Sequence, residues 1–588
     1  MKLEEMMEAA GGCGRFQWIH ISILTMATWL IAILRMTLLY YTAIPEHTCS
    51  QPQYNWGNFT ESERMNLTIP REMRDGRLQY SQCKIHQFNR TELLHGESSM
   101  FLNRSDRPEV QCSSWSYDRS YYEATVVTQW DLVCDRRWMV ATSQSVYMAG
   151  LLHKYIIDRH TFIKGFGRRK LVILTGIACN ILTYAVTFSP NYITWLIIRF
   201  AIASTEIAFG TISYVLAQEL VGKDWRLIVT VCCAMLWCLG YMTITGLAYF
   251  LRDWRNLNLA IAAVNTPFVI YAVFAMPSSP RWLHSQDRGE DSIKMIQTIA
   301  KTNRRTIPEK AEITETTVAK RANVIDLMRT PKMRKRSCAQ LFIWCVTSAV
   351  YYGLSFGAGT LIGSPYLNNF LNAAIEVPAS IVIWPLATKL GRILPLGVSL
   401  ILGGAALLST LAVPEDLGIV VLVLSLVGKC AISIAFILIY ILAVEVSPTV
   451  VRNIALGSYS MSARVGGVCA PFLMYLNVFH GNLSNIILGA LAVLAGLLVF
   501  ILPETRGKPL PETIDDAENF RRKHPKNDKD KPELDNKTYS QPNGRNNVED
   551  TSRPARQVNG QSNVAFELEI DTDIPHLDGS CASETVKH

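Results

Sequence analysis

The sequence predicts an all-α membrane protein with twelve transmembrane helices in two pseudo-repeated six-helix bundles and a large extracellular loop between helices 1 and 2. Of the 588 residues, 49% are hydrophobic and only 18% are charged, a composition that a soluble protein of this length could not easily keep in solution. The chain also contains twelve apolar runs of about 20 residues, the length that crosses roughly 30 Å of hydrocarbon. Short motifs repeat between its two halves.

The twelve runs define the predicted helices. The second is the weakest, because charged residues crowd its end. The runs cover residues 17–43, 139–157, 171–189, 193–216, 227–250, 257–276, 339–361, 365–388, 393–413, 417–444, 454–479 and 483–502.

Charge predicts the orientation. Residues 277–338 hold fourteen Lys and Arg against seven Asp and Glu, and basic segments mark the cytoplasmic side. An even number of helices puts both termini there, and the net charge of +8 reflects topology rather than a nucleic-acid partner. The expected order is a cytoplasmic N-terminus (1–16), helix 1 (17–43), an extracellular loop (44–138), helices 2–6 (139–276), a cytoplasmic basic linker (277–338), the C-terminal six-helix bundle (339–503) and a disordered cytoplasmic tail (504–588).

The expected extracellular loop has the features of a secreted segment. Four Asn-x-Ser/Thr sequons predict glycosylation, and four cysteines in a polar loop without zinc-type spacing predict two disulfides of undetermined pairing. The sequons begin at Asn58, Asn66, Asn89 and Asn103, and the cysteines are Cys49, Cys83, Cys112 and Cys134.

An internal repeat fixes the architecture. Three motifs recur in order, at offsets of 224, 226 and 226 residues. They are Gly167-Arg168-Arg169 with Gly391-Arg392, Glu219 and Arg226 with Glu445 and Arg452, and Pro277-Ser278-Ser279-Pro280-Arg281 with Pro503-Glu504-Thr505-Arg506. Two similar bundles that rock about a site near the bilayer midplane form the parallel repeat of a major facilitator transporter.

The motifs of an enzyme are missing from the sequence. It has no phosphate-binding Gly-x4-Gly-Lys-Ser/Thr loop, no metal-spaced His/Cys cluster and no nucleophile motif. We therefore expect neither an enzyme nor a cofactor, and a gradient as the energy source. The expected partners are small organic ions and the lipid bilayer, with no nucleic acid; the oligomeric state stays open.

Several short motifs stand out along the chain: "GGCGRFQ", "AIPEHTC", "VTQWDLVCD", "FGRRK", "SPRWL", "VEVSPTVVRN" and "LPETRGKPLPET". Together they resemble those of solute carrier family 22, the organic cation, anion and zwitterion transporters. The resemblance covers nearly the whole chain except the tail. It implies polyspecific transport of amphiphilic organic ions across the plasma membrane, by uniport or exchange.

Charged residues inside membrane spans are costly and are functional candidates by default. The six found here are Arg35, Arg199, Glu206, Glu376, Lys429 and Arg464. Arg464 lies about 16 Å deep in its helix, where it could hold a carboxylate in a bidentate pair. The position resembles that of the anion-type and carnitine-type branches of the family, which carry arginine there, whereas cation-type members carry aspartate. The alternative is a pair that fixes helix packing.

Glu376 gives the opposite indication. It stands beside Pro378 and resembles a glutamate of the cation and carnitine branches, while Ser380 replaces a lysine typical of anion carriers. One cation-preferring and one anion-preferring group suit a zwitterion, or a carboxylate whose arginine is partly neutralised. The alternative is an internal ion pair between Glu376 and Arg464.

The remaining site candidates are less specific. Arg35 could bind substrate or pair with Glu206, and Arg199 is expected to be structural. Aromatic side chains could form the wall of the site by stacking and cation–π contact. Those at positions that resemble the family's central cavity are Tyr351, Tyr352, Trp237, Tyr241, Phe436 and Tyr440.

The gating candidates are Glu219 with Arg226 and Glu445 with Arg452, charge pairs at cytoplasmic helix ends, together with the turn Gly167-Arg168-Arg169. The family pattern at this turn is Gly-x3-Asp-x2-Gly-Arg-Arg, but Lys164 stands in the aspartate position and His160 in the first glycine position. Two alternatives stay open. One is an organic cation transporter; the other, suggested by the divergent segment 151–165, is a transport-deficient member that acts as sensor or scaffold.

Overall fold

The computed structural model describes residues 3–51, 60–74, 77–87, 108–158, 167–222, 225–286, 288–306, 324–508 and 511–518. The chain divides into two units: Met1–Arg506 with Leu510–Arg521, and Gly507–Pro509 with Arg522–His588. Three predicted glycosylation sites, the divergent turn at 159–166 with His160 and Lys164, and the tail beyond 518 lie outside the described residues. The three sites are Asn58, Asn89 and Asn103.

Within the first unit, each predicted span overlaps a helix. Nine helical spans among the described residues are long and apolar enough to cross a membrane. The helices of the first half are α2 (Arg15–Met36) with α3 (Leu38–Tyr41), α7 (Trp138–Asp158), α8 (Arg168–Thr187), α9 (Tyr192–Leu220), α10 (Arg226–Phe250) and α11 (Trp254–Phe274). Those of the second half are α14 (Pro331–Gly357), α15 (Pro365–Ala374), α16 (Glu376–Leu390), α17 (Ile393–Ser409), α18 (Gly418–Val446), α19 (Arg452–Tyr475) and α20 (Leu483–Val499).

Glycines allow the closest helix contacts. A Cβ atom on Gly404 of α17 would stand 2.6 Å from the Gly489 carbonyl oxygen of α20, and one on Gly496 would stand 2.9 Å from that of Gly397. Helices in a bilayer gain little from the hydrophobic effect, so small residues that bring backbones together select the packing faces. The same device at Gly466 of α19 lets the backbone of α14 approach.

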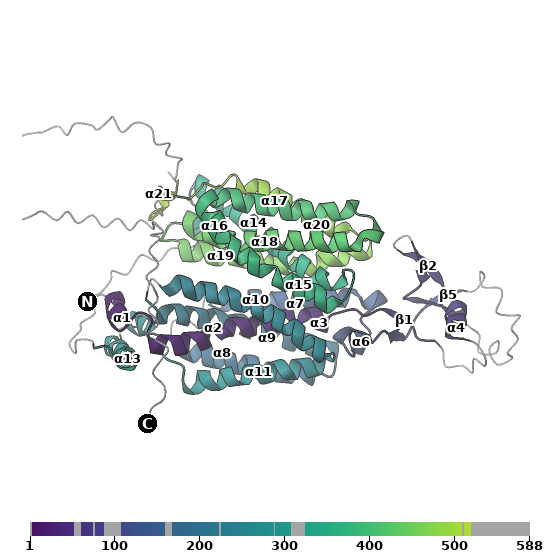
Figure 1. Cartoon of the computed structure of the whole chain (residues 1–588), viewed down its shortest axis with the longest axis horizontal. Helices are drawn as coiled ribbons and strands as arrows, with labels where there is room; N and C mark the ends of the chain where they lie inside the picture. Colours follow the sequence, from purple (N-terminus) through teal and green to yellow (C-terminus); the bar gives the residue numbers. More distant parts are fainter. Residues whose placement is uncertain are drawn as a thin grey trace, which may run out of the picture. The chain divides into compact units, whose positions relative to one another are not determined.

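The two halves lie side by side (Figure 1). They meet where α7 packs on α19 and α10 packs on α15 and α16. We call the end near the strands the loop end, and the end near α1 and α13 the linker end. Among the described residues, hydrogen bonds join the halves at three places. Ser145 Oγ donates to the Val468 carbonyl at 2.8 Å, Asn372 Nδ2 donates to the Tyr241 hydroxyl at 2.9 Å, and the Tyr366 hydroxyl donates to the Tyr121 carbonyl at 2.6 Å.

Three short antiparallel strand pairs form the segment between α3 and α7. The pairs are β1 (His47–Cys49) with β6 (Trp115–Tyr117), β2 (Arg71–Arg74) with β3 (Arg77–Tyr80), and β4 (Lys84–His86) with β5 (Glu109–Gln111). Two helices, α4 (Glu61–Thr68) and α6 (Val126–Gln129), complete it. Disulfides join Cys49 to Cys112 and Cys83 to Cys134, the pairing that the sequence left open. Asn66 lies on α4.

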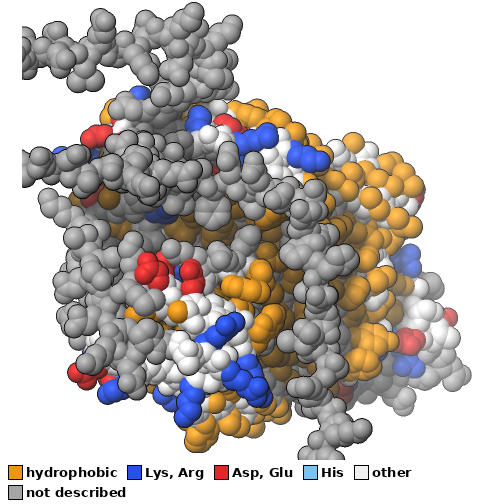
Figure 2. Space-filling view, turned by 60° about the vertical axis from the view of Figure 1, so that its left-hand side comes forward, with side chains coloured by type: hydrophobic (Ala, Val, Ile, Leu, Met, Phe, Trp, Pro, Cys, Tyr) orange, Lys and Arg blue, Asp and Glu red, His pale blue; other side chains and the backbone are white. Residues whose placement is uncertain are grey.

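The linker end carries short helices that the sequence analysis did not predict. They are α1 (Leu3–Ala9), α12 (Pro280–Ser285), α13 (Gly289–Thr302) and α21 (Ile514–Glu518). Short 3-10 turns lie at Cys134–Arg136, Val324–Leu327, Ala358–Thr360, Thr410–Ala412, Glu415–Leu417 and Leu476–Val478. Figure 2 turns the linker end forward and shows charged side chains gathered there, with hydrophobic side chains along the flanks.

Candidate functional site

The first buried ion pair joins α2 to α9. Arg35 Nη2 lies 2.9 Å and Nε 3.2 Å from Glu206 Oε1, with side-chain exposures of 7% and 0%. The Tyr147 hydroxyl on α7 donates to the other carboxylate oxygen. Arg35 was expected either to bind substrate or to pair with Glu206, and in this structure it pairs with Glu206.

The second buried ion pair joins α16 to α18. Lys429 Nζ lies 2.9 Å from Glu376 Oε1, which also accepts a hydrogen bond from the Tyr351 hydroxyl at 2.7 Å. The ammonium group also donates to Ser355 Oγ at 2.7 Å and lies 3.3 Å from the centroid of the Tyr351 ring. The alternative of a pair between Glu376 and Arg464 was therefore wrong. The sequence offered one signal for the true partner, an isolated lysine in an otherwise apolar helix.

Arg199 fills a buried aromatic box. It is 1% exposed, and its guanidinium lies 4.5 Å from the centroid of the Tyr147 ring and 5.3 Å from that of the Tyr41 ring. Its Nη2 donates to Thr37 Oγ1 at 3.2 Å. Cation–π contacts of this kind are stronger without water, and they support the structural role expected for Arg199.

The predicted aromatic residues gather beside these pairs. The Tyr351 ring centroid lies 5.3 Å from those of Tyr352 and Phe436, and Phe436 lies 5.9 Å from Tyr440. From the other half, Trp237 packs 5.2 Å from the Arg35 guanidinium and its side chain interacts with Tyr351. Aromatic faces from α10, α14 and α18 thus meet between the two halves.

Tyr241 and Arg464 flank this group. Tyr241 is fully buried and bonded to Asn372. Arg464 is 8% exposed and lies on the α19 face of Gly467, where a Cβ atom would stand 3.4 Å from the Tyr352 ring and 3.6 Å from the Met148 sulfur. Arg464 therefore stands at the boundary between the halves, one turn from the aromatic group.

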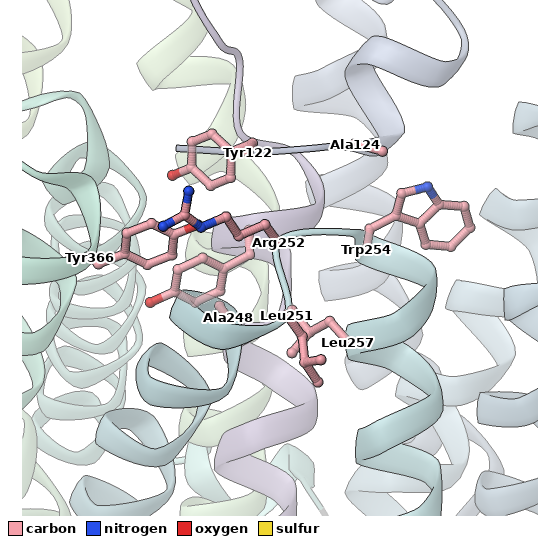
Figure 3. Close-up of a pocket in the computed structure, with 9 residues that line it drawn as sticks. Tyr122, Ala124, Ala248, Leu251, Arg252, Trp254, Leu257 and Tyr366 are labelled. Carbon is pink, nitrogen blue, oxygen red and sulfur yellow. The ribbon is translucent and has the colours of Figure 1, made fainter. Parts of the chain in front are cut away.

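A small pocket at the loop end reveals a contact that the sequence analysis missed (Figure 3). Tyr366 of α15 stacks on Tyr40 of the other half, with ring centroids 6.0 Å apart, and its hydroxyl donates to the Tyr121 carbonyl at 2.6 Å. In Figure 3 the Arg252 side chain extends between Tyr122 and Tyr366. The pocket lies in the aromatic contact that joins the halves, away from the ion pairs.

The gating residues pair differently from the prediction. Arg168 Nη2 lies 3.3 Å from Glu219 Oε1, and Arg392 Nη2 lies 2.9 Å from Glu445 Oε1. In the described residues neither acid pairs with the arginine seven positions later in its own motif. A break in the helix separates acid and arginine in each motif, so the neighbouring turn supplies the partner. The freed arginines bond elsewhere: Arg226 to Glu4 and Arg452 to the Ser447 carbonyl.

Glycine conformation explains the turn that carries these arginines. Gly167 and Gly391 have φ values of 80° and 86°, which residues other than glycine rarely adopt. Each glycine directs the following arginine toward the acid of its own half. Arg169 is partly exposed at the start of α8.

Comparisons with known proteins agree with this architecture. A family model described as sugar (and other) transporter matches residues 129–516. The chain is 33% identical to an organic cation transporter protein of Drosophila melanogaster, over 89% of this chain and 96% of that one. It is 31% identical to a beta-alanine transporter of the same organism (88% and 89%) and 32% identical to solute carrier family 22 member 6-B of Xenopus laevis (88% and 95%).

A solved structure gives the same fold. The inward open conformation of the xylose transporter XylE from E. coli superposes with a TM-score of 0.53, covering 86% of this chain and 99% of that one, at 12% identity. These relatives are transporters, not enzymes. The chain has the major facilitator fold, and it belongs to the sugar (and other) transporter family and, within it, to solute carrier family 22.

Proposed function

We propose that this chain is a polyspecific plasma-membrane secondary transporter of small organic anions and carnitine-like zwitterions, working by alternating access as a uniporter or exchanger. The observation that carries the proposal is the charge balance inside the described spans. Among the charged side chains that these described spans bury, four are cations, Arg35, Arg199, Lys429 and Arg464, and two are carboxylates, Glu206 and Glu376. Excess positive charge in a membrane is costly, so an anionic ligand would stabilise it.

The position of Glu376 supports the same preference. Its carboxylate is engaged by Lys429 and by Tyr351, which weakens its attraction for a cationic substrate. Arg464 is the candidate residue for binding a substrate carboxylate. The candidate wall of the substrate site is the aromatic group, which consists of Tyr351, Tyr352, Phe436, Tyr440, Trp237 and Tyr241. A beta-alanine transporter among the relatives moves a molecule with both charges, which makes zwitterions reasonable substrates here.

Organic cation transport is the second candidate, favoured by the aromatic group and by relatives of that name. A transport-deficient sensor or scaffold is the third, since the segment 151–165 departs from the family pattern. For topology we propose that the segment 44–138 is extracellular and glycosylated, and that both termini and the linker are cytoplasmic. The glycans would be carried by Asn58, Asn66, Asn89 and Asn103.

Uptake assays test the function. Cells that display the chain are given labelled dicarboxylates, carnitine-like zwitterions and quaternary ammonium ions. The proposal expects uptake of the first two classes. Absence of flux for every compound, despite surface expression, would leave the sensor or scaffold role.

Arg464→Ala tests whether Arg464 binds the substrate. The matched control is Lys170→Ala, which removes an exposed basic side chain at the start of a helix. Because a charge-assisted pair to a bound carboxylate is lost, anion uptake should fall at least about tenfold, as expected for a loss above about 1.4 kcal/mol. Cation uptake should be spared. An equal loss for cations and anions would make Arg464 a packing residue.

A further inference from the structure

The repeated motifs form a charge cluster at the linker end of each half. In the second half both acids belong to the repeat. Glu445 pairs with Arg392, and Glu504 accepts the backbone N–H groups of Arg392 and Ile393, each at 3.0 Å. Burial alone would raise the pKa of Glu504, but these N–H groups with those of Thr505 and Arg506 hold it below its usual value. The second half thus carries its own two carboxylates.

The first half lacks the second carboxylate. Glu219 pairs with Arg168 in the same way as Glu445 with Arg392, but Ser278 stands at the repeat position of Glu504. The structure fills the space differently as well. A Cβ atom on Gly391 would stand 2.7 Å from the Glu504 carboxylate, whereas one on Gly167 would stand 2.8 Å from the Trp282 ring.

A carboxylate from outside the repeat lies in this cluster. Glu4 Oε1 on α1 is 3.1 Å from Arg226 Nη2 and 3.5 Å from Arg281 Nη1. These two guanidinium groups lie near each other: burial and the charge of Arg226 together lower the pKa of Arg281. The charge of Glu219 opposes this repulsion at Arg281, and Glu4 adds a second carboxylate from outside the repeat.

Independent contacts hold α1 against the first half. Met6 and Met7 are fully buried. Asn303, just after α13, donates to the Ala10 carbonyl and accepts from the Phe16 N–H, both at 2.9 Å. Gly14 has no side chain to block this approach of Asn303. The N-terminal segment is thus docked by packing, and the Glu4 carboxylate is directed to the arginines.

We propose that Glu4 is a positioning residue of the transport cycle, supplying to Arg226 and Arg281 the carboxylate that the first half lacks at Ser278. The inference rests on the proposed transport function for its consequence, but not for its structural part. The bridge is about one-third exposed on both sides, so it can break and re-form as the linker ends of the two halves move. The N-terminal helix is then a component of the first half's charge cluster.

The structural part is tested without transport. Cys13 lies between α1 and α2 and is partly buried, whereas Cys338 is exposed on α14. In full-length protein reconstituted in nanodiscs, maleimide labelling of both thiols is followed by peptide-resolved mass spectrometry. Labelling of Cys13 through local opening of α1 reports the opening equilibrium. Glu4→Gln should raise the Cys13 rate about threefold or more relative to Cys338, as expected when an ion pair of modest strength is lost.

The control Glu8→Gln makes the same charge change on an exposed position of α1 and should leave the Cys13 rate unchanged. If Glu4→Gln and Glu8→Gln label alike, Glu4 does not hold α1 and the proposal is overturned. This outcome is independent of whether the chain transports anything.

Transport measures the consequence. Glu4→Gln should lower the maximal rate with little change in KM, because the substrate site is distant, and Ser278→Glu in the same chain should restore the rate. Cys13 should still label fast in this double variant, because the restored carboxylate does not belong to α1. A loss that Ser278→Glu fails to restore would show that α1 acts by covering the cluster, not by its charge, and would overturn the proposal. Absence of flux in the unmodified chain would count against the proposed function and leave the labelling result standing.

Discussion

The charged residues of the membrane helices are held mostly by one another. Arg35 and Glu206 are 171 positions apart, and Lys429 and Glu376 lie on different helices. The sequence identified the six buried charges of the described membrane helices, because a charge in an apolar run stands out. It did not identify Lys429 as the partner of Glu376, because pairing depends on which helices become neighbours and on their rotation.

Glu376→Gln tests the Lys429 pair. Removing one member of a buried ion pair leaves the other charge uncompensated, at a cost of about 3–5 kcal/mol. We expect a clear loss of thermal stability in detergent, followed by fluorescence-detected size-exclusion chromatography after heating.

The double variant Glu376→Gln with Lys429→Met removes both charges and should regain much of that stability, since a buried pair replaced by apolar groups is often nearly neutral. A double variant as unstable as Glu376→Gln alone would mean that the carboxylate, not the pair, supports the fold.

At the scale of elements, two predicted spans are each divided in the structure: 17–43 holds α2 and α3, and 365–388 holds α15 and α16. The sequence predicted a single span over 365–388, but the structure ends α15 at Ala374 and begins α16 at Glu376. Pro378 has no N–H to donate to the Ala374 carbonyl, four residues earlier, which accounts for the break. Pro378 stands out in the sequence, but a proline within an apolar run can either break a helix or only kink it.

The short helices at the linker end were missed for another reason. Helix α13 alternates buried residues such as Ile296 and Ile299 with exposed polar ones, and a search for long apolar runs does not detect this pattern. Helix α1 has only seven residues, too few for periodicity to identify.

The start of α17 depends on Glu504. Its pKa lies below the usual value, so the unfolded state binds its proton more readily. The stabilisation is therefore present above the unfolded pKa of about 4.3 and is lost as pH falls through the lower folded value. Glu504→Gln should cost about 1 kcal/mol at neutral pH, the scale of a lost helix cap.

The measurement is the melting temperature of Glu504→Gln and of the unmodified protein, taken from pH 7 down to acidic pH. The difference should shrink as pH falls. Glu512→Gln changes an exposed acid nearby and is the control. A gap that stays constant with pH would show that the Glu504 charge has no part in the cap.

Tyr366 on α15 anchors the loop-end contact between the halves. Tyr366→Ala removes a ring that packs on Tyr40, Tyr122 and Tyr249, and aromatic pairs contribute about 0.5–1.5 kcal/mol each. We expect the loop end to open more often, so that Asn372→Cys reacts faster with a membrane-impermeant thiol reagent added on that side.

Tyr366→Phe is the matched variant, since it keeps the ring and loses only the hydrogen bond to the Tyr121 carbonyl. It should stay close to the parent in Asn372→Cys labelling. Equal labelling of the Tyr366→Ala and parent proteins would mean that the seal lies elsewhere.

For the whole molecule, the repeat predicted two six-helix halves, and the fold is that of a major facilitator transporter. The sequence could not predict where the halves touch. A transporter of this fold adopts more than one arrangement of the same two bundles, so a single sequence encodes several contact patterns. Here the hydrogen bonds between Ser145 and Val468 and between Asn372 and Tyr241 lie in the loop half, while the ion pairs of Arg168 and Arg392 each stay within one half.

This distribution makes a prediction about access. With the halves joined toward the loop end, the central aromatic group should be reached from the linker end. Phe436 is partly exposed within that group, so Phe436→Cys should react faster with an impermeant thiol reagent supplied from the linker side than from the loop side. Opposite vesicle orientations and peptide-resolved mass spectrometry measure the two rates, and Thr142→Cys, partly exposed toward the loop end, should show the opposite preference.

Combining Phe436→Cys with Tyr366→Ala tests whether the two ends are coupled. If rocking of rigid halves links them, loosening the loop-end seal should speed labelling of the cysteine at 436 from the loop side and slow it from the linker side, because one population is drawn from the other. Faster labelling from both sides would instead indicate a leak through a disrupted bundle. Labelling that was already faster from the loop side in the parent protein would contradict the arrangement described here.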